Sequence, residues 1–351
     1  MHSAAAWAIA AAAAFLLTPL AITVARRTKF YDLPKGYKGH RTPTPYLGGS
    51  AIILAVLLAV VVSGGTAGRY TPIVICAVLM WAMGTVDDKV NLPIRVRVVV
   101  EVAVGITLSA CGLGWQVFHQ GVADGALSVC WVVGVMNAFN LMDNMDGASA
   151  TTAAVSSLGA GTLALLSGRS GLAPLCFATA GACIGFLPRN LANPAKIFMG
   201  DGGSLPIGMI VAAVAMSAVN RDYLGPRGVV IGALLVGLVI FDTTLVTVSR
   251  SRAGRSVFTG GRDHTTHRLA QVVGTPRRVA MTLAGAQLTL CTLTIGLARA
   301  GGGWVLLAGG LGVAFGLVLL WQFETSPWFR VAPREAQGKD ATSPGHATLV
   351  A

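Results

Sequence analysis

Charged and aromatic residues are scarce in this 351-residue chain, and that scarcity excludes a water-soluble globular class. Only 11% of the residues are charged and 7% are aromatic, while 54% are hydrophobic. Soluble domains carry about a quarter charged residues. Mean hydropathy is +0.68, and the sequence shows neither an internal repeat nor a soluble-domain boundary. The composition therefore predicts an integral membrane protein.

The sequence also lacks the cysteine spacings that disulfide frameworks and zinc sites use. No Cys-x-x-Cys pattern occurs, and most of the six cysteines fall inside apolar runs. We interpret them as small buried hydrophobic residues. They are Cys76, Cys111, Cys130, Cys176, Cys183 and Cys291.

What the chain has instead is a series of eleven apolar runs near membrane-spanning length. The first run lacks the basic start of a cleavable signal and meets Arg26 and Arg27 at its far end, so we expect it to stay as a helix. The predicted fold is all-α and polytopic, with about 11 transmembrane helices. The runs are 4–24, 47–64, 70–86, 97–114, 126–142, 149–167, 172–187, 204–219, 229–249, 279–298 and 303–321.

The net charge of +12 follows the positive-inside rule and does not indicate a nucleic-acid partner. With the N-terminus outside and the C-terminus cytoplasmic, most basic residues fall in inside loops. We expect one transmembrane domain over residues 1–330 and a disordered cytoplasmic tail over 331–351. The predicted outside loops hold five of the 26 basic residues: Arg69, Arg169, Arg221, Arg227 and Arg299.

Unusual polar clusters all fall on the predicted inside face, whereas the outside loops are short and nearly featureless. One cytoplasmic active face explains this better than scattered polarity does. The clusters are "KGYKGHRTPTPYLGG" (35–49), "GTVDDKVNLP" (84–93), "NAFNLMDNMDGAS" (137–149), "FMGDGGS" (198–204) and "GRSVFTGGRDHTTHRL" (254–269).

Asp87 and Asp88 stand side by side where the third run ends. Adjacent carboxylates repel each other, and at a helix C-terminus they also oppose the helix dipole. A divalent cation or a polarised substrate would relieve both penalties. Ordinary solvation of a helix end is the alternative.

Asn137, Asn140, Asp143 and Asp146 recur every three residues and cover about half of a helix surface. An aspartate at the centre of a membrane span costs about 2.5–3.5 kcal/mol on insertion scales, so a lipid-facing position is excluded. The helix should therefore line a polar cavity or end near Gly147. Carboxylate and amide oxygens are ligands suited to magnesium or manganese. A structural network of these side chains inside the bundle is the alternative.

The stretch "MGDGGSLPIG" predicts a tight glycine turn followed by a helix that Ser204 can cap. The amides at the start of that helix would form a cradle for phosphate. Asp201, among the glycines, would repel an anion unless a metal bridged the two.

In "RDHTTHRL", His264 and His267 lie between Arg262 and Arg268. A zinc site would need a third ligand that the segment does not supply. A basic loop that binds phosphate is the better interpretation, and solvated positive-inside charge is the alternative for the arginines.

Taken together and in order, these motifs resemble the polyprenyl-phosphate N-acetylhexosamine-1-phosphate transferases over about residues 30–270. The resemblance implies transfer of a sugar-1-phosphate from a UDP-sugar to undecaprenyl or decaprenyl phosphate, with release of UMP. It also implies Mg²⁺ (or Mn²⁺) as cofactor, a bacterial inner-membrane location, a cytoplasmic active site, and cell-wall or surface-glycan synthesis. A homodimer is an assembly to test. The final motif resembles the WecA- and TagO-type branch, which uses UDP-N-acetylglucosamine. The branch that uses UDP-MurNAc-pentapeptide has three contiguous histidines there.

The resemblance also implies roles for individual residues. Asn140 and Asp201 match the positions that hold the metal, Asp87 matches the carboxylate that orients or deprotonates the lipid phosphate, and Asp88 matches its neighbour. His264 matches a catalytic position in the loop that closes over the diphosphate. The candidate substrate-binding residues are Lys38, His40, Asn137, Asp143, Asp146, Gly202, Ser204, Arg262, His267 and Arg268.

Several positions depart from the family pattern or leave a choice open. Thr266 replaces a common histidine, Asn144 a glycine and Glu101 a glutamine, which puts the sugar specificity in doubt. Asp242 belongs either to a buried network or to the substrate site. Direct attack by the lipid phosphate is favoured over a covalent intermediate. The alternative functions are a magnesium-dependent prenyltransferase, whose motifs place aspartates four apart, and an ion-coupled transporter.

Overall fold

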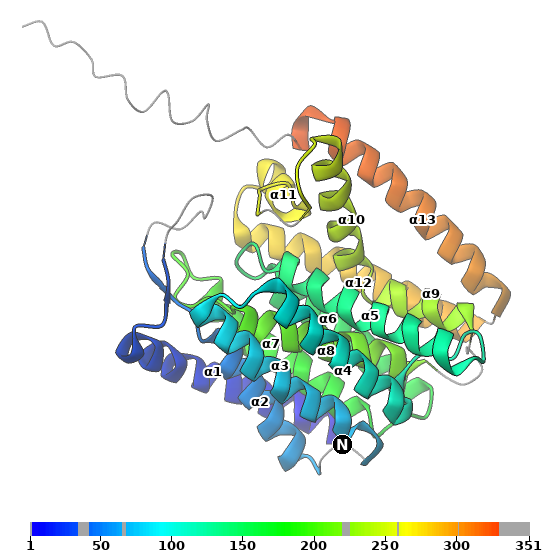
Figure 1. The fold of residues 1–351 in the computed structure, drawn as a ribbon, viewed down its shortest axis with the longest axis horizontal. Helices are drawn as coiled ribbons and strands as arrows, with labels where there is room; N and C mark the ends of the chain where they lie inside the picture. Colours follow the sequence, from blue (N-terminus) through cyan, green and yellow to red (C-terminus); the bar gives the residue numbers. More distant parts are fainter. Residues whose placement is uncertain are drawn as a thin grey trace, which may run out of the picture.

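The computed structural model describes residues 2–33, 42–64, 68–219, 225–257, 260–300 and 302–329, and these form a bundle of helices (Figure 1). The small exception is an antiparallel pairing of β1 (Tyr31–Asp32) with β2 (Thr44–Pro45). Two predicted site residues, Lys38 and His40, and the predicted tail lie outside the described residues. The predicted all-α class is confirmed.

Every one of the eleven predicted apolar runs coincides with a helix or, for 229–249, with a pair of helices. Ten runs correspond to single helices: α1 (His2–Thr28), α2 (Gly48–Val62), α3 (Thr71–Val90), α4 (Ile94–Leu108), α5 (Gly121–Met142), α6 (Ala148–Leu166), α7 (Ala173–Asn190), α8 (Asp201–Ala218), α12 (Pro276–Ala300) and α13 (Gly302–Thr325). The remaining elements are η1 (Gly68–Tyr70), η2 (Ser109–Leu113), α9 (Pro226–Leu235), α10 (Gly237–Arg252), α11 (Thr265–Val273) and η4 (Pro327–Phe329).

Seven helices in the described chain are long and apolar enough to cross a membrane, so this is a multi-pass membrane protein. They are α1, α4 with its η2 extension, α5, α6, α8, α12 and α13, and the pair α9–α10 would be an eighth. Helix α2 is apolar but has only 15 residues. The predicted total of eleven spans and the predicted orientation remain predictions.

The run 229–249 is not the continuous span that its hydropathy predicts, because α9 and α10 meet at 84°. In a membrane each backbone group freed by such a break needs a partner. Gln287 of α12 supplies an acceptor and a donor at the break. Its Oε1 accepts from Leu238 N (3.3 Å), and its Nε2 donates to Leu235 O (2.8 Å). The side chain that repairs the break lies about fifty residues further along the chain, so the local sequence shows no sign of it.

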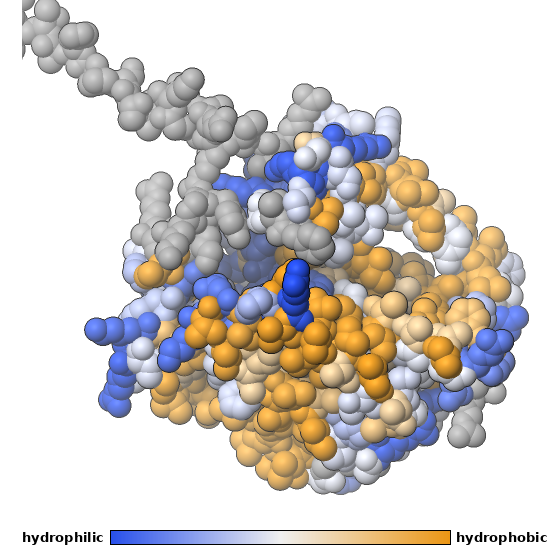
Figure 2. Space-filling model, in the orientation of Figure 1, coloured by the Kyte–Doolittle hydropathy of each residue, from blue (hydrophilic) through white to orange (hydrophobic). Residues whose placement is uncertain are grey.

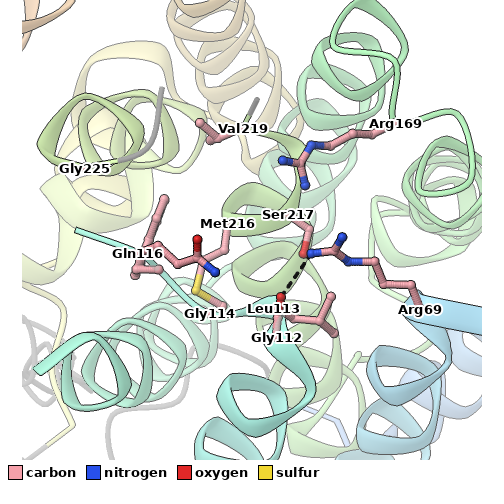
Figure 3. A pocket seen from close by; sticks show the side chains of 11 residues that line it. Arg69, Gly112, Leu113, Gly114, Gln116, Arg169, Met216, Ser217, Val219 and Gly225 are labelled. Carbon is pink, nitrogen blue, oxygen red and sulfur yellow. Dashed lines mark hydrogen bonds between the residues drawn. The ribbon is translucent and has the colours of Figure 1, made fainter. Parts of the chain in front are cut away.

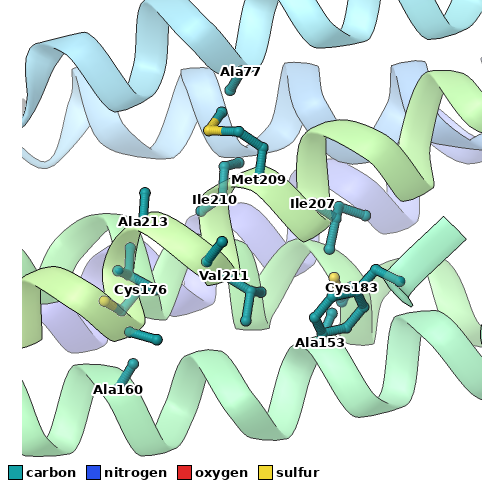
Figure 4. Close-up of a cluster of buried hydrophobic side chains, with 14 of the residues drawn as sticks. Ala77, Ala153, Ala160, Cys176, Cys183, Ile207, Met209, Ile210, Val211 and Ala213 are labelled. Carbon is teal, nitrogen blue, oxygen red and sulfur yellow. The ribbon is translucent and has the colours of Figure 1, made fainter. Parts of the chain in front are cut away.

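Helix α8 lies at the centre of the bundle, and 94% of its spanning window is buried. Ile207 and Met209 of α8 pack among small side chains from neighbouring helices, including Ala77 of α3, Ala153 of α6 and Cys183 of α7 (Figure 4). Small residues let membrane helices approach closely, and packing rather than water exclusion then holds them together. On the face shown in Figure 2, hydrophobic side chains cover much of the middle and reach the lower edge, and hydrophilic ones gather at the left, the top and the lower right.

The cysteines only partly follow the prediction that they are buried. Four are buried and free, but Cys111 and Cys130 are exposed and also free. Both lie in predicted membrane segments, η2 and α5, where exposed positions face lipid and a small apolar side chain is tolerated.

The chain reverses direction from one helix to the next, which brings the polar clusters together at one end of the bundle. The C-terminal ends of α3 and α5 meet the N-terminal ends of α4, α6 and α8 there. Helix α11 follows α10 at this same end and packs against α12 (Figure 1).

Candidate active site

The glycine turn before α8 places Asp201 at the first position of that helix. Gly200 has φ = 72°, which a residue with a side chain rarely adopts, and the helix begins directly after it. The expectation that Ser204 caps this helix is therefore wrong, because Ser204 lies inside the first turn. A Cβ on Gly84 of α3 would lie 2.3 Å from Asp201 O, so the two backbones touch at this point.

The cap of α8 comes from α3 instead. Asp88 accepts hydrogen bonds from Asp201 N (2.8 Å) and Gly202 N (3.0 Å) through its two carboxylate oxygens. A carboxylate at a helix N-terminus satisfies free amides and complements the dipole. The amides that the sequence suggested as a phosphate cradle are thus occupied by Asp88, and this geometry corrects that interpretation.

One guanidinium joins three of the predicted site residues. Arg97 Nη1 lies 2.9 Å from Asp87 Oδ2 and 3.2 Å from Asp201 Oδ2, and its Nη2 donates to Asn140 Oδ1 at 3.4 Å. Arg97 of α4 did not feature in the predicted site, where it counted only as positive-inside charge. A useful signal was available, because Arg97 stands one helical turn before the buried Glu101 at the start of an apolar run.

Asn140 and Asp201, the two predicted metal ligands, are in direct contact. Asn140 Nδ2 donates to Asp201 Oδ1 (2.7 Å) and to Ser204 Oγ (3.0 Å). Asp87 is held from its other side by Leu92 N, which donates to Oδ1 at 2.6 Å. The structure therefore brings Asp87, Asn140, Asp201 and Ser204 into one group, which we call the acidic end together with Asp88 and Asp143.

This group contains more carboxylates than cations. Burial and the neighbouring negative charges raise the pKa values of two of the carboxylates. Burial, followed by the charge of Asp201, raises the pKa of Asp88 to about 8, although two backbone amides oppose the shift. Burial also raises the pKa of Asp143 well above its usual range, and the charges of Asp201 and Asp146 add to that effect. Asp87 and Asp201 share one guanidinium, Arg97, so the acidic end favours an additional cation.

The donor atoms of the acidic end fit magnesium, which takes only part of its ligands from protein, better than a metal that protein side chains hold entirely. In the described part of the chain, no group of three or more His, Cys, Asp and Glu side chains is arranged to hold a metal ion. Magnesium commonly uses one or two carboxylates and completes its shell with water and substrate phosphates. Asp87 Oδ2, Asp201 Oδ2 and Asn140 Oδ1 already share one cation in Arg97, which stands in for part of the charge that a metal would bring.

Helix α5 ends at Met142, so one of the two outcomes expected for its polar face is confirmed. Asp143 and Asp146 lie in the turn before α6, and Gly147 N donates to Asn190 Oδ1 (2.7 Å) to hold that turn. Asn137 lies deeper in α5, where its Nδ2 donates to Glu101 Oε2 at 2.6 Å. Its amide group joins α5 to α4 inside the bundle.

The loop that carries His264 and His267, which we call the histidine loop, is held by a buried carboxylate. Asp242 of α10 is fully buried, its Oδ2 lies 2.9 Å from His264 Nδ1, and its Oδ1 accepts from Thr265 N at 2.7 Å. Asp242 therefore caps α11 and orients the His264 ring at the same time. Of the two roles that the sequence left open for Asp242, the buried network is the one seen.

Arg250 defines which nitrogen of His264 carries the proton. Arg250 Nη2 lies 3.4 Å from His264 Nε2, and a guanidinium can only donate. The proton therefore belongs on Nδ1, donated to Asp242, which leaves a lone pair on Nε2. Arg250 itself is fixed by two hydrogen bonds to Asp263, at 2.9 and 3.0 Å. Burial alone would raise the pKa of Asp263, but Arg250 outweighs it and the pKa is lowered.

The other basic residues of the loop have different surroundings. Arg268 is buried, and its guanidinium pairs with Glu324 (2.7 Å) and donates to Asp263 O (3.0 Å), so it ties α11 to the end of α13. Arg262 is exposed. Burial, followed by the charges of His264 and Arg262, lowers the pKa of His267 to about 4, so that side chain is neutral at pH 7.

Two of the departures from the family pattern meet in space. Thr266 Oγ1 of α11 donates to Asn144 Oδ1 in the turn after α5, and Asn144 Nδ2 donates back to Leu141 O (2.6 Å). This contact joins the histidine loop to the acidic end. Sequence reasoning named both residues, but their partnership spans 122 positions and has no local pattern.

Comparison with known proteins places this fold and site in a family. Residues 70–219 match the family described as Glycosyl transferase family 4. A Bacillus subtilis protein named probable undecaprenyl-phosphate N-acetylglucosaminyl 1-phosphate transferase is 30% identical over 264 residues, which cover 72% of this chain and 73% of the relative. The chain belongs to glycosyl transferase family 4 and is a membrane-embedded transferase.

Further relatives carry closely related names. The decaprenyl-phosphate N-acetylglucosaminephosphotransferase of Mycobacterium tuberculosis is 32% identical over 287 residues, covering 71% of this chain and 70% of the relative. The undecaprenyl-phosphate alpha-N-acetylglucosaminyl 1-phosphate transferase of Escherichia coli is 28% identical over 298 residues, covering 78% and 80%. The predicted family is thereby confirmed.

Proposed function

We propose that this protein transfers N-acetylglucosamine-1-phosphate from UDP-N-acetylglucosamine to a polyprenyl phosphate and releases UMP. The observation that carries the proposal is the convergence of Asp87, Asn140 and Asp201, from three helices, on one positive charge. A site of that kind suits a reaction in which phosphate charge must be positioned and neutralised. The names of the relatives support the sugar and the lipid acceptor.

The residues of the acidic end divide the work. Asp87, held by Leu92 N and Arg97, orients the lipid phosphate. A phosphate monoester with a second pKa near 6 is already largely ionised at neutral pH, so little proton transfer is needed for direct attack. Asn140 and Asp201 would hold Mg²⁺, which neutralises the UDP-sugar diphosphate and the charge on departing UMP when bound. Asp88 keeps the start of α8 in place beneath them.

His264 faces the substrate phosphates in the proposed reaction. Its Nε2 has a lone pair and one long contact with Arg250, so a proton taken from solvent at Nε2 would let the ring donate a hydrogen bond to a diphosphate oxygen. Asp242 would stabilise the imidazolium that results, since its carboxylate already contacts Nδ1. Asp143, Asp146, Arg262 and His267 surround the nucleotide-sugar in this proposal.

The site opens to the cytoplasm of a bacterial cell, at the inner membrane. Support for this orientation comes from the charge asymmetry of the loops, because the acidic end and the histidine loop share the predicted basic side of the membrane. Dissolved UDP-sugar and a membrane-bound acceptor can meet only at such an interface.

Product analysis tests the proposal. Purified protein is incubated with polyprenyl phosphate and, in parallel, UDP-N-acetylglucosamine, UDP-N-acetylgalactosamine or UDP-MurNAc-pentapeptide. We expect UMP and a lipid-linked sugar diphosphate from UDP-N-acetylglucosamine or a close UDP-HexNAc relative, and none from the pentapeptide substrate. Turnover of the pentapeptide substrate at a comparable rate would overturn the sugar assignment. Absence of UMP with every donor would overturn the reaction class.

A further inference from the structure

A polar cavity lies at the end of the bundle opposite to the acidic end. It has a volume of about 260 Å³, and its lining comes from the loops and helix ends after α2, α4, α6 and α8 (Figure 3). Arg69 of η1 and Arg169, which follows α6, both line it. We call this region the basic end. None of its described lining residues is part of the site proposed above.

The two arginines bring positive charge to the cavity without a described counter-charge. Among the residues that the structure describes, the cavity lining contains no aspartate or glutamate. Arg69 Nη2 donates to a backbone carbonyl, Gly112 O, at 3.2 Å, and among the described residues the guanidinium of Arg169 has no ion-pair or hydrogen-bond partner. Figure 3 shows the two side chains reaching toward the region of Ser217 from different elements. Such a pair of guanidinium groups is suited to an oxyanion.

Two buried polar groups of the lining also lack partners within the described chain. Ser217 is 4% exposed and Trp115 is 6% exposed, and neither Ser217 Oγ nor Trp115 Nε1 has a hydrogen-bond partner. Buried polar groups in folded proteins are nearly always bonded, so these two mark a place where a further acceptor is accommodated. Each belongs to a residue that lines the cavity.

Exposed apolar side chains end the two helices that precede these arginines in the chain. Val61 and Val62, at the end of α2, are 75% and 60% exposed and precede Arg69. Leu165 and Leu166, at the end of α6, are also exposed and precede Arg169. A free anion gains nothing from these exposed apolar side chains, whereas a phospholipid places its phosphate at the interface and its acyl chains along such residues.

The positive-inside rule makes this arrangement unexpected by chance. The predicted outside loops carry only five basic residues, and two of them line one cavity. Basic residues are less frequent on that side of a membrane, so two of them in one cavity call for an explanation. Charge, unpartnered donors and exposed apolar side chains therefore all favour the same kind of ligand.

We propose that the cavity at the basic end binds the phosphate headgroup of an anionic phospholipid in the leaflet opposite to the active site. Arg69 and Arg169 bind the phosphate oxygens, and the acyl chains lie along the exposed ends of α2 and α6. This site is separate from the polyprenyl phosphate site, and it does not depend on the reaction assigned to the acidic end.

The test is native mass spectrometry of the full chain in detergent, titrated with phosphatidylglycerol. We expect Arg69→Gln/Arg169→Gln to lose one bound lipid and to bind it about a hundredfold more weakly, about tenfold for each charge-assisted contact. The matched control is Arg227→Gln/Arg299→Gln, which removes the same charge from exposed positions on the same predicted side that do not line the cavity. It should bind like the wild type.

Two further ligands identify the source of the phosphate. Diacylglycerol with the same acyl chains lacks the phosphate, and inorganic phosphate lacks the chains; we expect neither to compete with phosphatidylglycerol. Equal binding of diacylglycerol, full competition by inorganic phosphate, or equal loss in the control variant would each overturn the proposal. Arg169→Gln alone guards against misfolding, since its guanidinium has no described partner to lose, and unchanged lipid binding by that variant would also overturn the proposal.

Discussion

The two ends of the bundle hold opposite charges, and they treat their carboxylates differently. At the acidic end, Asp87 and Asp201 share a single guanidinium, Arg97, and carboxylates exceed cations. At the basic end, Asp124, a carboxylate that the structure describes, accepts hydrogen bonds from the backbone amides of Val117, Phe118 and Gln120. The acidic end keeps negative charge that a ligand must balance, whereas the basic end uses the Asp124 carboxylate to hold a loop.

The same contrast separates two carboxylates that act on helix starts. Asp124 lies in the first turn of α5 and binds amides within seven residues of itself. Asp88 caps α8 from another helix, across 113 positions, and sits directly beneath Asp201. Local capping serves stability, whereas capping across helices fixes one part of the site relative to another.

The largest expected effect is on turnover by Asp201→Asn. The change removes a charge on which the proposed metal depends, while the first turn of α8 keeps its cap from Asp88. We expect a loss of roughly a hundredfold or more in kcat, the usual scale for a group that stabilises developing charge. Thermal unfolding in detergent should stay within a few degrees of the wild type. Near-normal turnover at limiting magnesium would contradict the assignment of Asp201.

A second, smaller loss is expected when Asp242 is replaced. Asp242→Asn keeps an acceptor for Thr265 N but cannot hold the proton-bearing Nδ1 of His264. We expect kcat to fall by about 10–100-fold, as when a carboxylate that orients a functional histidine is removed.

The double variant separates this orienting role from a structural one. In a His264→Gln background, Asp242→Asn should cost little more, because the ring it orients is gone. ¹⁵N NMR of the histidines should show His264 protonated at Nδ1 in the wild type. Additive losses, or protonation at Nε2, would count against the orienting role.

At the basic end, Asp124→Asn should affect stability and leave the chemistry alone. The amide retains one acceptor oxygen but weakens three backbone hydrogen bonds. We expect about 1–2 kcal/mol of lost stability, measured as a lower Tm, with unchanged kcat per folded molecule. A hundredfold loss of kcat without a lower Tm would remove the distinction drawn between the two ends.

The smallest effect concerns acid sensitivity near the histidine loop. Since the pKa of His267 is lowered to about 4 in the folded protein, the unfolded chain takes up this proton first as the pH falls below 6.5. Stability should therefore decline between pH 6.5 and 4 by up to about 1.4 kcal/mol per pH unit from this group. His267→Gln should flatten that part of the Tm-against-pH curve and leave it unchanged above pH 7. A curve parallel to the wild type throughout would rule this out.

Hydropathy predicts the positions of the helices well, because each apolar run is a local property of about twenty residues. All eleven predicted runs contain helix, and the polar clusters that predict one active face do meet around Asp87, Asn140 and Asp201. The bend between α9 and α10 was not predictable from hydropathy, since Gln287 of α12 stabilises it.

The contacts that sequence reasoning missed join different helices. Arg97 reaches Asp201 across 104 positions, and Asp88 replaces Ser204 as the cap of α8 across a similar distance. Asp242 could be recognised as a costly buried charge, but its partner depends on how the loop before α11 folds back. Residue type indicates that a partner is needed, whereas only tertiary structure identifies it.

Magnesium dependence tests most directly whether the acidic end is the transferase site. UMP release from UDP-N-acetylglucosamine is measured against magnesium concentration for the wild type, Asn140→Ala and, as a control from the basic end, Arg69→Gln. We expect no release without a divalent cation, and a half-maximal concentration about tenfold higher for Asn140→Ala, which loses a neutral ligand. Arg69→Gln should follow the wild-type curve. Full activity without divalent cation, or identical curves for the wild type and Asn140→Ala, would contradict the account.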